Sequence, residues 1–302
     1  MQKNNGLDKN QLISFVIFSA ILMAFMFYFQ NKQSDEKQVA DAKAKTEQKV
    51  ASKTIANNIN ATVNAAAIKN VTVKNKELTL EFASLGGQLS SVEINQYKAY
   101  NAKTDKHDLP LYLIEKNNSS YGFQFKDKTG KVFNTKDLVF VPSVKDNTVT
   151  MTAQVSGATI QYVYELLDNY TLDFNVKTQG LSSIVTDEKA DFHWNYTVRG
   201  MEKGRSQEQT HSEFNYAFDN YGSTDYDTNG FEEPEETLNW LAVKQQFFTS
   251  IIESTNGFTQ TKGTQETIEK GEFLKKFNFD GQVKLAGNEL NQNFKWYFLP
   301  LD

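Results

Sequence analysis

The chain has no cysteine among its 302 residues and only three histidines, His107, His193 and His211. The absence of cysteine excludes disulfides, a thiolate nucleophile and thiolate metal sites. It does not identify a reducing compartment, because many exported bacterial proteins also lack cysteine. The three histidines are widely separated, and no pair has the short helical spacing of a zinc site. We therefore predict no metal site.

The local motifs of common enzyme classes are also missing. The sequence contains no G-x-S-x-G elbow, no Walker loop and no dinucleotide-binding fingerprint. We predict that the chain is not an enzyme and that it has no catalytic, cofactor-binding or metal-binding residues. One alternative is that His193, which alternates with Phe192 and Trp194, pairs with Asp191 on the polar face of a strand. That pair would suit catalysis on a sugar-binding sandwich.

Positive charge is scarce beyond the first part of the chain. The net charge of -5 divides into +3 for residues 1–68 and -8 for residues 69–302. So acidic a region is a poor binder of nucleic acid and of anionic lipid headgroups. No Lys or Arg lies between Arg205 and Lys244, whereas nine acids lie from Glu208 to Glu236. We predict a solvated negative surface there, with docking of a basic partner segment as the alternative.

One long apolar run, LISFVIFSAILMAFMFYF, covers residues 12–29 and contains no charge, Gly or Pro. With its flanking residues it can span a hydrocarbon core of about 30 Å. It exceeds the core of a typical signal peptide, and no small-x-small cleavage site directly follows it. We predict an uncleaved transmembrane signal anchor, with a cleaved signal peptide as the alternative. Residues 1–11 would then be cytoplasmic and residues 30–302 would lie on the far side of the membrane.

Residues 30–68 contain no aromatic residue, Gly or Pro and are rich in Lys, Ala, Gln and Asn. Such a segment cannot bury a core of its own. We predict a polar tether that lets the following domain move relative to the bilayer, with a short partner-binding helix as the alternative.

From residue 69 onward the hydrophobic period is two. Leu78, Leu80 and Phe82 alternate with polar residues, and the alternation recurs in residues 149–155, 162–166, 172–176 and 192–198. Turn signals separate these runs at residues 85–87, 128–130, 145–147 and 256–257. The chain's 23 Phe, 13 Tyr and 3 Trp can fill a large core. We predict a mainly β domain, a large antiparallel β-sandwich over residues 69–302.

The best helix candidate covers residues 234–243, because Pro234 and two acids would open its first turn. Just before it, Asp225, Asp227, Asn229, Gly230 and Glu236 match the spacing of an EF-hand calcium loop. Pro at the tenth loop position and the lack of an entering helix argue against calcium. We favour an acidic surface loop.

Several segments together resemble the large periplasmic domain of the YidC branch of the YidC/Oxa/Alb family of membrane protein insertases. The strand, Gly-Gly turn and strand of residues 71–94, VTVKNKELTLEFASLGGQLSSVEI, are the most similar. The likeness continues in YELLDNYTLDF (164–174), WLAVKQQFF (240–248) and FKWYFLP (294–300). The family usually has Tyr-Phe-Gly-Pro at the last site, so the local turn is expected to differ. The resemblance covers essentially all 302 residues.

The resemblance implies a β-supersandwich related to sugar mutarotases. It also implies a single-pass protein of the bacterial inner membrane with residues 30–302 in the periplasm. Its partners would be the membrane and nascent inner-membrane proteins, alone or beside the Sec translocon. The insertase site of the family lies among five further transmembrane helices, which do not occur before Asp302, so no site residue can be carried over. The alternative functions are a carbohydrate-binding or mutarotase-like sandwich and a freestanding anchored scaffold.

Overall fold

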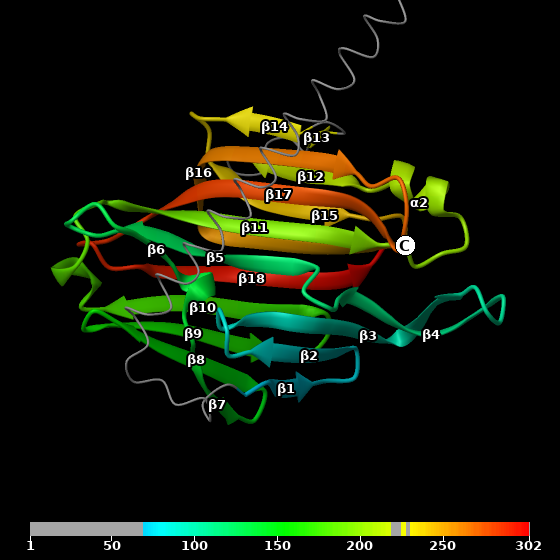
Figure 1. Cartoon of the computed structure of the whole chain (residues 1–302), viewed down its shortest axis with the longest axis horizontal. Coiled ribbons are helices and arrows are strands. Elements are labelled where there is room, and N and C mark those ends of the chain that lie inside the picture. Colours follow the sequence, from blue (N-terminus) through cyan, green and yellow to red (C-terminus); the bar gives the residue numbers. More distant parts are fainter. Residues whose placement is uncertain (1–68, 219–224, 228–229, 302) are drawn as a thin grey trace, which may run out of the picture. The chain divides into compact units, whose positions relative to one another are not determined.

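Antiparallel strands make up most of the domain. The computed structural model describes residues 69–218, 225–227 and 230–301, which belong to one compact unit, residues 63–302. The predicted anchor (12–29) and tether (30–68) lie outside the described residues. In the described ranges, no helix is both long enough and apolar enough to cross a bilayer. The prediction of a mainly β antiparallel domain is confirmed (Figure 1).

A small sheet of four strands begins the described chain. It consists of β1 (Val71–Lys74), β2 (Leu78–Ala83), β3 (Gln88–Asn101) and β4 (Lys106–Ile114), which pair in that order. The three predicted core residues of β2, Leu78, Leu80 and Phe82, are fully buried. The predicted turn between β2 and β3 contains Gly87 at φ +61, where an added Cβ would lie 2.8 Å from the Phe140 ring. Close packing and backbone conformation therefore both require glycine there.

The large sheet has 14 strands. Ten follow one another in the order β6, β5, β11, β17, β16, β18, β10, β9, β8, β7, while β15 and β14 add to β16, β12 adds to β15, and β13 adds to β12. Their bounds are β5 (Ser119–Lys126), β6 (Val132–Asn134), β7 (Val141–Lys145), β8 (Thr148–Val155), β9 (Ala158–Leu166), β10 (Thr171–Gln179), β11 (Lys189–Arg199), β12 (Glu213–Phe218), β13 (Asp225–Asp227), β14 (Gly230–Glu233), β15 (Leu238–Lys244), β16 (Phe248–Thr267), β17 (Phe273–Lys284) and β18 (Asn291–Pro300).

Strand β16 connects two parts of the large sheet. Its first half pairs with β15 and β18, and its second half pairs with β14 and β17. Between the halves, Gly257 (φ +70) and Gln260 (φ +52) adopt left-handed conformations, and the registers with β15 and β17 shift. The prediction that residues 256–257 end a strand is therefore wrong. They form an irregularity at which one strand bends and exchanges partners, a role typical of β-bulges.

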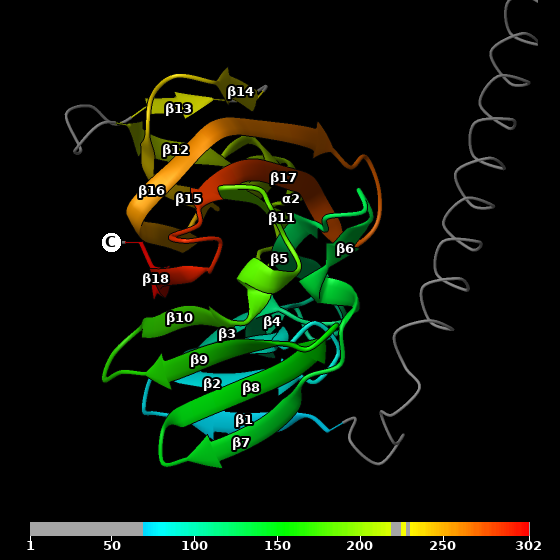
Figure 2. The ribbon, with the colours of Figure 1, turned by 90° about the vertical axis from the view of Figure 1, so that its left-hand side faces the viewer.

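The core lies between the small sheet and the large one. Figure 2 shows β1–β3 beside β8–β10, and the rings of Phe82 and Tyr164 meet there at 4.6 Å. A chain of hydrogen bonds crosses this core: the Leu89 N–H donates to the Tyr121 hydroxyl (3.0 Å), which donates to the Tyr164 hydroxyl (2.8 Å), which donates to the Gly87 carbonyl (2.9 Å). Burial raises the pKa of both tyrosines. Both hydroxyls therefore remain protonated and available as donors.

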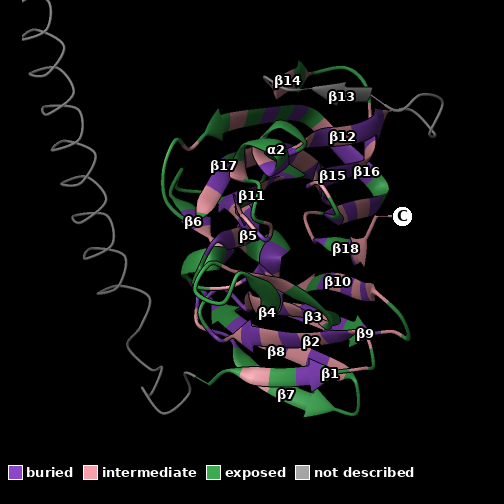
Figure 3. Ribbon diagram, turned by 90° about the vertical axis from the view of Figure 1, so that its right-hand side faces the viewer, coloured by how far each residue is buried: buried purple, intermediate pink, exposed green. Residues whose placement is uncertain are grey.

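Inward and outward residues alternate along most strands, as the striped colouring of Figure 3 shows. In β10, for example, Leu172, Phe174 and Val176 are fully buried, whereas the residues between them are partly exposed. The period-two pattern therefore predicted the buried face of this strand correctly.

The helix predicted over residues 234–243 is wrong. This segment turns and then forms β15, which pairs with β12 on one side and β16 on the other. The Glu233 carboxylate accepts the N–H groups of Glu235 and Glu236, so the acids that suggested a helix start form a tight turn. Pairing on both sides outweighs the local signal.

The α-helix in the described ranges is α2 (Arg205–Thr210), a single short element that we did not predict. Two 3₁₀ turns, η2 (Thr135–Asp137) and η3 (Leu181–Ser183), complete the described elements.

Candidate functional site

His193 lies on the outer face of β11, as its alternation with Phe192 and Trp194 predicted. Its partner is not Asp191. His193 Nδ1 lies 2.5 Å from Oδ1 of Asp280, which is the register partner of His193 on β17. Asp191 instead accepts the side-chain amide of Gln282 at 3.0 Å. Residues two apart on one strand share a face, but Asp280 is directly opposite across the ladder, and sequence spacing gives no signal for such a pair.

A polar hollow of about 270 Å³ surrounds this pair, lined by residues that include Ser120, Gln124, Asn134, Lys136, His193, Asn195 and Asp280. A second hollow, of about 440 Å³, adjoins it, with Gln124 common to both linings. Because Asp191, Gln282, Lys126 and Lys189 line the second hollow, the two follow the same strands, β5, β11 and β17. We refer to the two hollows together as the outer groove.

The outer groove offers polar groups without partners. In the described part of the chain, the side-chain amides of Gln124 and Asn195 make no hydrogen bond, and His193 Nε2 is buried without a partner. The side-chain oxygen of Asn134, Oδ1, is engaged, because it accepts the Lys136 N–H at 3.0 Å and caps the start of η2. The groove therefore combines unengaged amides with one His–Asp pair.

Aromatic rings are not presented in this groove. Tyr121 and Phe125 contribute to its lining, but they are 1% and 2% exposed and their rings belong to the core. A carbohydrate site of the mutarotase-like alternative would cluster aromatic and carboxylate side chains in its cleft. Within the described lining, the groove provides carboxylates without the rings that stack on sugars.

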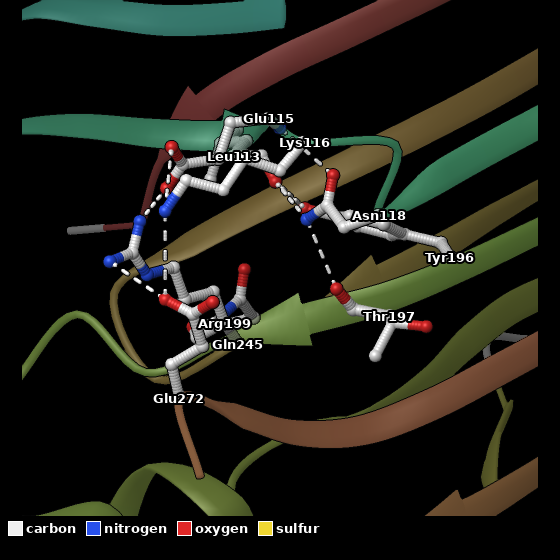
Figure 4. A network of polar contacts seen from close by, with 9 residues as sticks. All are labelled: Leu113, Glu115, Lys116, Asn118, Tyr196, Thr197, Arg199, Gln245 and Glu272. Atoms are coloured by element: carbon white, nitrogen blue, oxygen red, sulfur yellow. Dashed lines mark hydrogen bonds and ion pairs between the residues drawn. The ribbon is translucent and has the colours of Figure 1, made fainter. Parts of the chain in front are cut away.

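A second polar cluster joins the segments at which β4, β11, β15 and β16 end (Figure 4). Arg199, at the end of β11, forms ion pairs with Glu115 and, at 3.1 Å, with Glu272. Asn118 donates to the carbonyls of Leu113 (3.1 Å) and Thr197 (3.0 Å).

The same cluster extends to the turn between β15 and β16. There, Gln245 donates its side-chain amide to the Arg199 carbonyl at 2.9 Å. Each of these side chains bonds a backbone or a charge on another loop. We interpret the role of the cluster as structural, because its hydrogen bonds and ion pairs hold these loops together. We did not predict the cluster from the sequence, because its four segments, around residues 115, 199, 245 and 272, are distant in the chain and share no motif.

The remaining histidines have separate local roles. His107 Nε2 lies 2.7 Å from Oε2 of Glu202, and His211 Nδ1 lies 2.9 Å from the Gln207 carbonyl. No group of three potential metal ligands occurs among the described residues.

The prediction of a solvated negative surface from Glu208 to Glu236 is wrong for Glu208, and two other acids of this stretch have cationic partners. Glu208 is buried and accepts three hydrogen bonds from the N–H groups of Met201 and Glu202. Burial raises the pKa of the Glu208 carboxyl, although these hydrogen bonds oppose the shift. Glu213 pairs with Lys244, and Glu232 pairs with Lys262. Lys244 and Lys262, which lie on other strands, thus neutralise acids that have no Lys or Arg close to them in the sequence.

The EF-hand-like segment forms strands rather than a calcium loop between helices. Asp225 and Asp227 belong to β13, which pairs with β12, and Gly230 begins β14, which pairs with β16. Glu236 lies in the turn that the Glu233 carboxylate organises. Asn229 lies outside the described residues. The backbone on both sides of residues 228–229 is therefore paired strand, which differs from the loop that we favoured.

Comparison with known proteins relates this architecture to a family. The family model described as YidC periplasmic domain matches residues 70–298. A membrane protein insertase YidC of Parabacteroides distasonis is 27% identical over 97% of this chain and 52% of the relative. The chain spans about half the length of the curated relatives it matches.

Two solved structures are similar at low sequence identity. A galactose mutarotase related enzyme of Lactobacillus acidophilus aligns with a TM-score of 0.47 at 10% identity, over 76% of this chain and 97% of that one. The periplasmic domain of Thermotoga maritima YidC aligns with a TM-score of 0.37 at 12% identity, over 80% of this chain and 86% of that one. At such scores neither structure carries an assignment of function.

Proposed function

This chain belongs to the YidC periplasmic domain family, and on that premise we propose that it is the extramembrane part of a membrane protein insertase. Its role would be to contact inner-membrane proteins while they insert and fold. The observation that carries the proposal is the family match over residues 70–298, which includes nearly all described strands. The name of the curated relatives, membrane protein insertase, supports the same role.

The membrane arrangement is part of the proposal. Residues 1–11 would be cytoplasmic, residues 12–29 would anchor the chain in the inner membrane, and residues 30–68 would tether the domain of residues 69–302 in the periplasm. The length and composition of the apolar run support this arrangement. The β-supersandwich related to mutarotases and contact with the Sec translocon are finer parts of the same proposal.

A contact role suits the chemistry of the domain. The aromatic side chains fill the core, whereas the outer groove presents hydrogen-bonding groups at the surface. We assign no bond-making or bond-breaking step to this domain. The rival carbohydrate function has one supporting feature, the His193–Asp280 pair in a polar hollow, but the lining lacks the exposed ring that it requires.

Site-specific photo-crosslinking of the full chain in membrane vesicles tests the proposal. A photo-reactive amino acid would replace single exposed residues on several surfaces, such as Gln96, Asn195 and Asn291, while a radiolabelled inner-membrane protein is synthesised. We expect adducts from at least one surface, and none with a secreted protein of equal length. The absence of adducts from every position would refute the contact role.

A further inference from the structure

The outer groove has the dimensions of an extended polypeptide. Along β5 it reaches from Ser120 to Lys126, which is about 20 Å at the rise of a β-strand. Outward residues on its strands recur every second position, at about 6.6 Å, and this is also the two-residue repeat of an extended chain. Gln124 lies near the middle of this length and borders both hollows.

The polar groups of the groove suit a peptide main chain. The amides of Gln124 and Asn195 each carry donors and an acceptor, and neither group is engaged within the described residues. Main-chain N–H and C=O groups alternate in the same way along a polypeptide. His193 Nε2 adds one more buried group that has no partner.

Other ligand classes fit less well. The rings of Tyr121 and Phe125 are buried, so no platform is available for a pyranose. Asp187, Glu188, Lys126 and Lys189 mix both signs of charge at one end, which does not favour a polyanion.

Simple addition of a strand to β5 is also disfavoured. Its edge N–H groups at Tyr121 and Phe123 already donate to Gln88 Oε1 and Thr135 Oγ1, each at 2.8 Å. A ligand would therefore lie over the face of the sheet and bond the side-chain amides, rather than extend the sheet at its edge.

We propose that the outer groove binds an extended segment of a client polypeptide through hydrogen bonds to its main chain. This inference rests on the proposed contact function and assigns it a surface. Because the bonds involve the main chain, binding depends little on client sequence, which suits a protein that handles many different clients.

Fluorescence anisotropy with the full chain in detergent tests the inference. The probe is a fluorescein-labelled, capped peptide of eight Ser, Thr and Val residues, and its control is the same peptide N-methylated at every residue. We expect saturable binding of the first peptide and at least tenfold weaker binding of the second, since N-methylation removes every main-chain donor.

Variants then locate the site. The double variant Gln124→Ala/Asn195→Ala should weaken peptide binding about tenfold, because two bonds to the main chain are lost. The matched variant Gln96→Ala/Asn291→Ala removes the same side chains from exposed positions on β3 and β18 and should change binding less than twofold. Thermal melting of each variant verifies that the fold is retained.

Equal binding by both double variants, or equal binding of both peptides, would overturn the inference. So would the absence of peptide binding, especially if monosaccharides shifted the NMR signals of Asn195 and His193, which would assign the groove to sugars. Failure here is distinct from failure of the proposed function. Crosslinks to nascent chains from other surfaces, without peptide binding, would reject only the groove, whereas no crosslinks from any surface would reject the contact role itself.

Discussion

The two faces of strands β5, β11 and β17 use alternate residues of the same segments for opposite purposes. The inner face carries large buried side chains, among them Tyr121, Phe123, Phe192, Trp194, Tyr196, Phe277 and Phe279. The outer face carries Ser120, Gln124, Asp191, His193, Asn195, Asp280 and Gln282.

The inner and outer faces differ in how many of their polar side-chain groups form hydrogen bonds. On the inner face, the Tyr121 hydroxyl is enclosed in a chain of hydrogen bonds, and Tyr196 donates to the Leu113 carbonyl at 2.9 Å. On the outer face, the Gln124 and Asn195 amides make no hydrogen bond within the described residues. The comparison indicates that stability depends on the inner face and that the outer face is free to serve recognition.

Adjacent residues of β11 provide the strongest test of this division. Trp194→Asp would bury an unpaired carboxylate at a position that is 1% exposed, and we expect a loss of stability above about 4 kcal/mol. Asn195→Asp, one residue further and exposed, should cost less than about 1 kcal/mol. Far-UV circular dichroism during thermal melting would measure both variants, and equal melting temperatures would disprove the assignment of faces.

A smaller effect is expected from one buried hydroxyl. Tyr164→Phe leaves the Gly87 carbonyl without its donor and interrupts the bond to Tyr121, and should destabilise the fold by about 1–3 kcal/mol. Tyr100→Phe removes an exposed hydroxyl that bonds Asp105 and should leave stability nearly unchanged. Urea denaturation followed by tryptophan fluorescence gives the two free energies of unfolding. A larger cost for Tyr100→Phe would contradict the hydrogen-bond chain.

The charged side chains of the loop cluster in Figure 4 are partly exposed, so they are less buried than Tyr164 and more buried than Asp105. Arg199→Ala leaves Glu115 and Glu272 with only their longer pairs to Lys116, each 3.9 Å, and we expect a loss of about 1–2 kcal/mol. Lys203→Ala breaks an exposed pair with Asp105 and should leave stability nearly unchanged. Hydrogen exchange would report faster opening at residues 115–118 only in the Arg199 variant. Unchanged hydrogen exchange at residues 115–118 would contradict the role of the cluster in holding the loops together.

The smallest effect concerns pH. Lys275 is 8% exposed, and burial lowers its pKa, so the folded state favours the neutral amine more than the unfolded chain does. Unfolded molecules therefore bind more protons between the lowered pKa and about 10.4, and the contribution of Lys275 to stability rises with pH across that window.

Urea titrations between pH 7 and pH 10 would compare Lys275→Met with the unaltered chain. Relative to the unaltered chain, Lys275→Met should lose stability as pH rises, by less than about 1 kcal/mol overall. A Lys275→Met variant that shows no trend with pH, or that gains stability as pH rises, would contradict the lowered pKa of Lys275 in the fold.

Local pattern predicted the strands well and the site poorly. Leu80 and Phe174 could be assigned to a buried face because period two is visible within six residues. The helix expected at residues 234–243 failed because β12 and β16, distant in sequence, pair with that segment on both sides. His193 was placed on the correct face, but its partner Asp280 is 87 residues away and could not be identified from spacing.

By itself, the sequence determined a mainly β antiparallel domain and membership in a family, since alternation and short similar segments are local properties of a chain. Tertiary structure alone decided that Asp280 faces His193, that cations of β15 and β16 neutralise Glu213 and Glu232, and that Gln124 and Asn195 border one groove. The physical reason is register: strand pairing brings residues from distant segments together, and the alignment of two strands is a property of the folded sheet rather than of either strand.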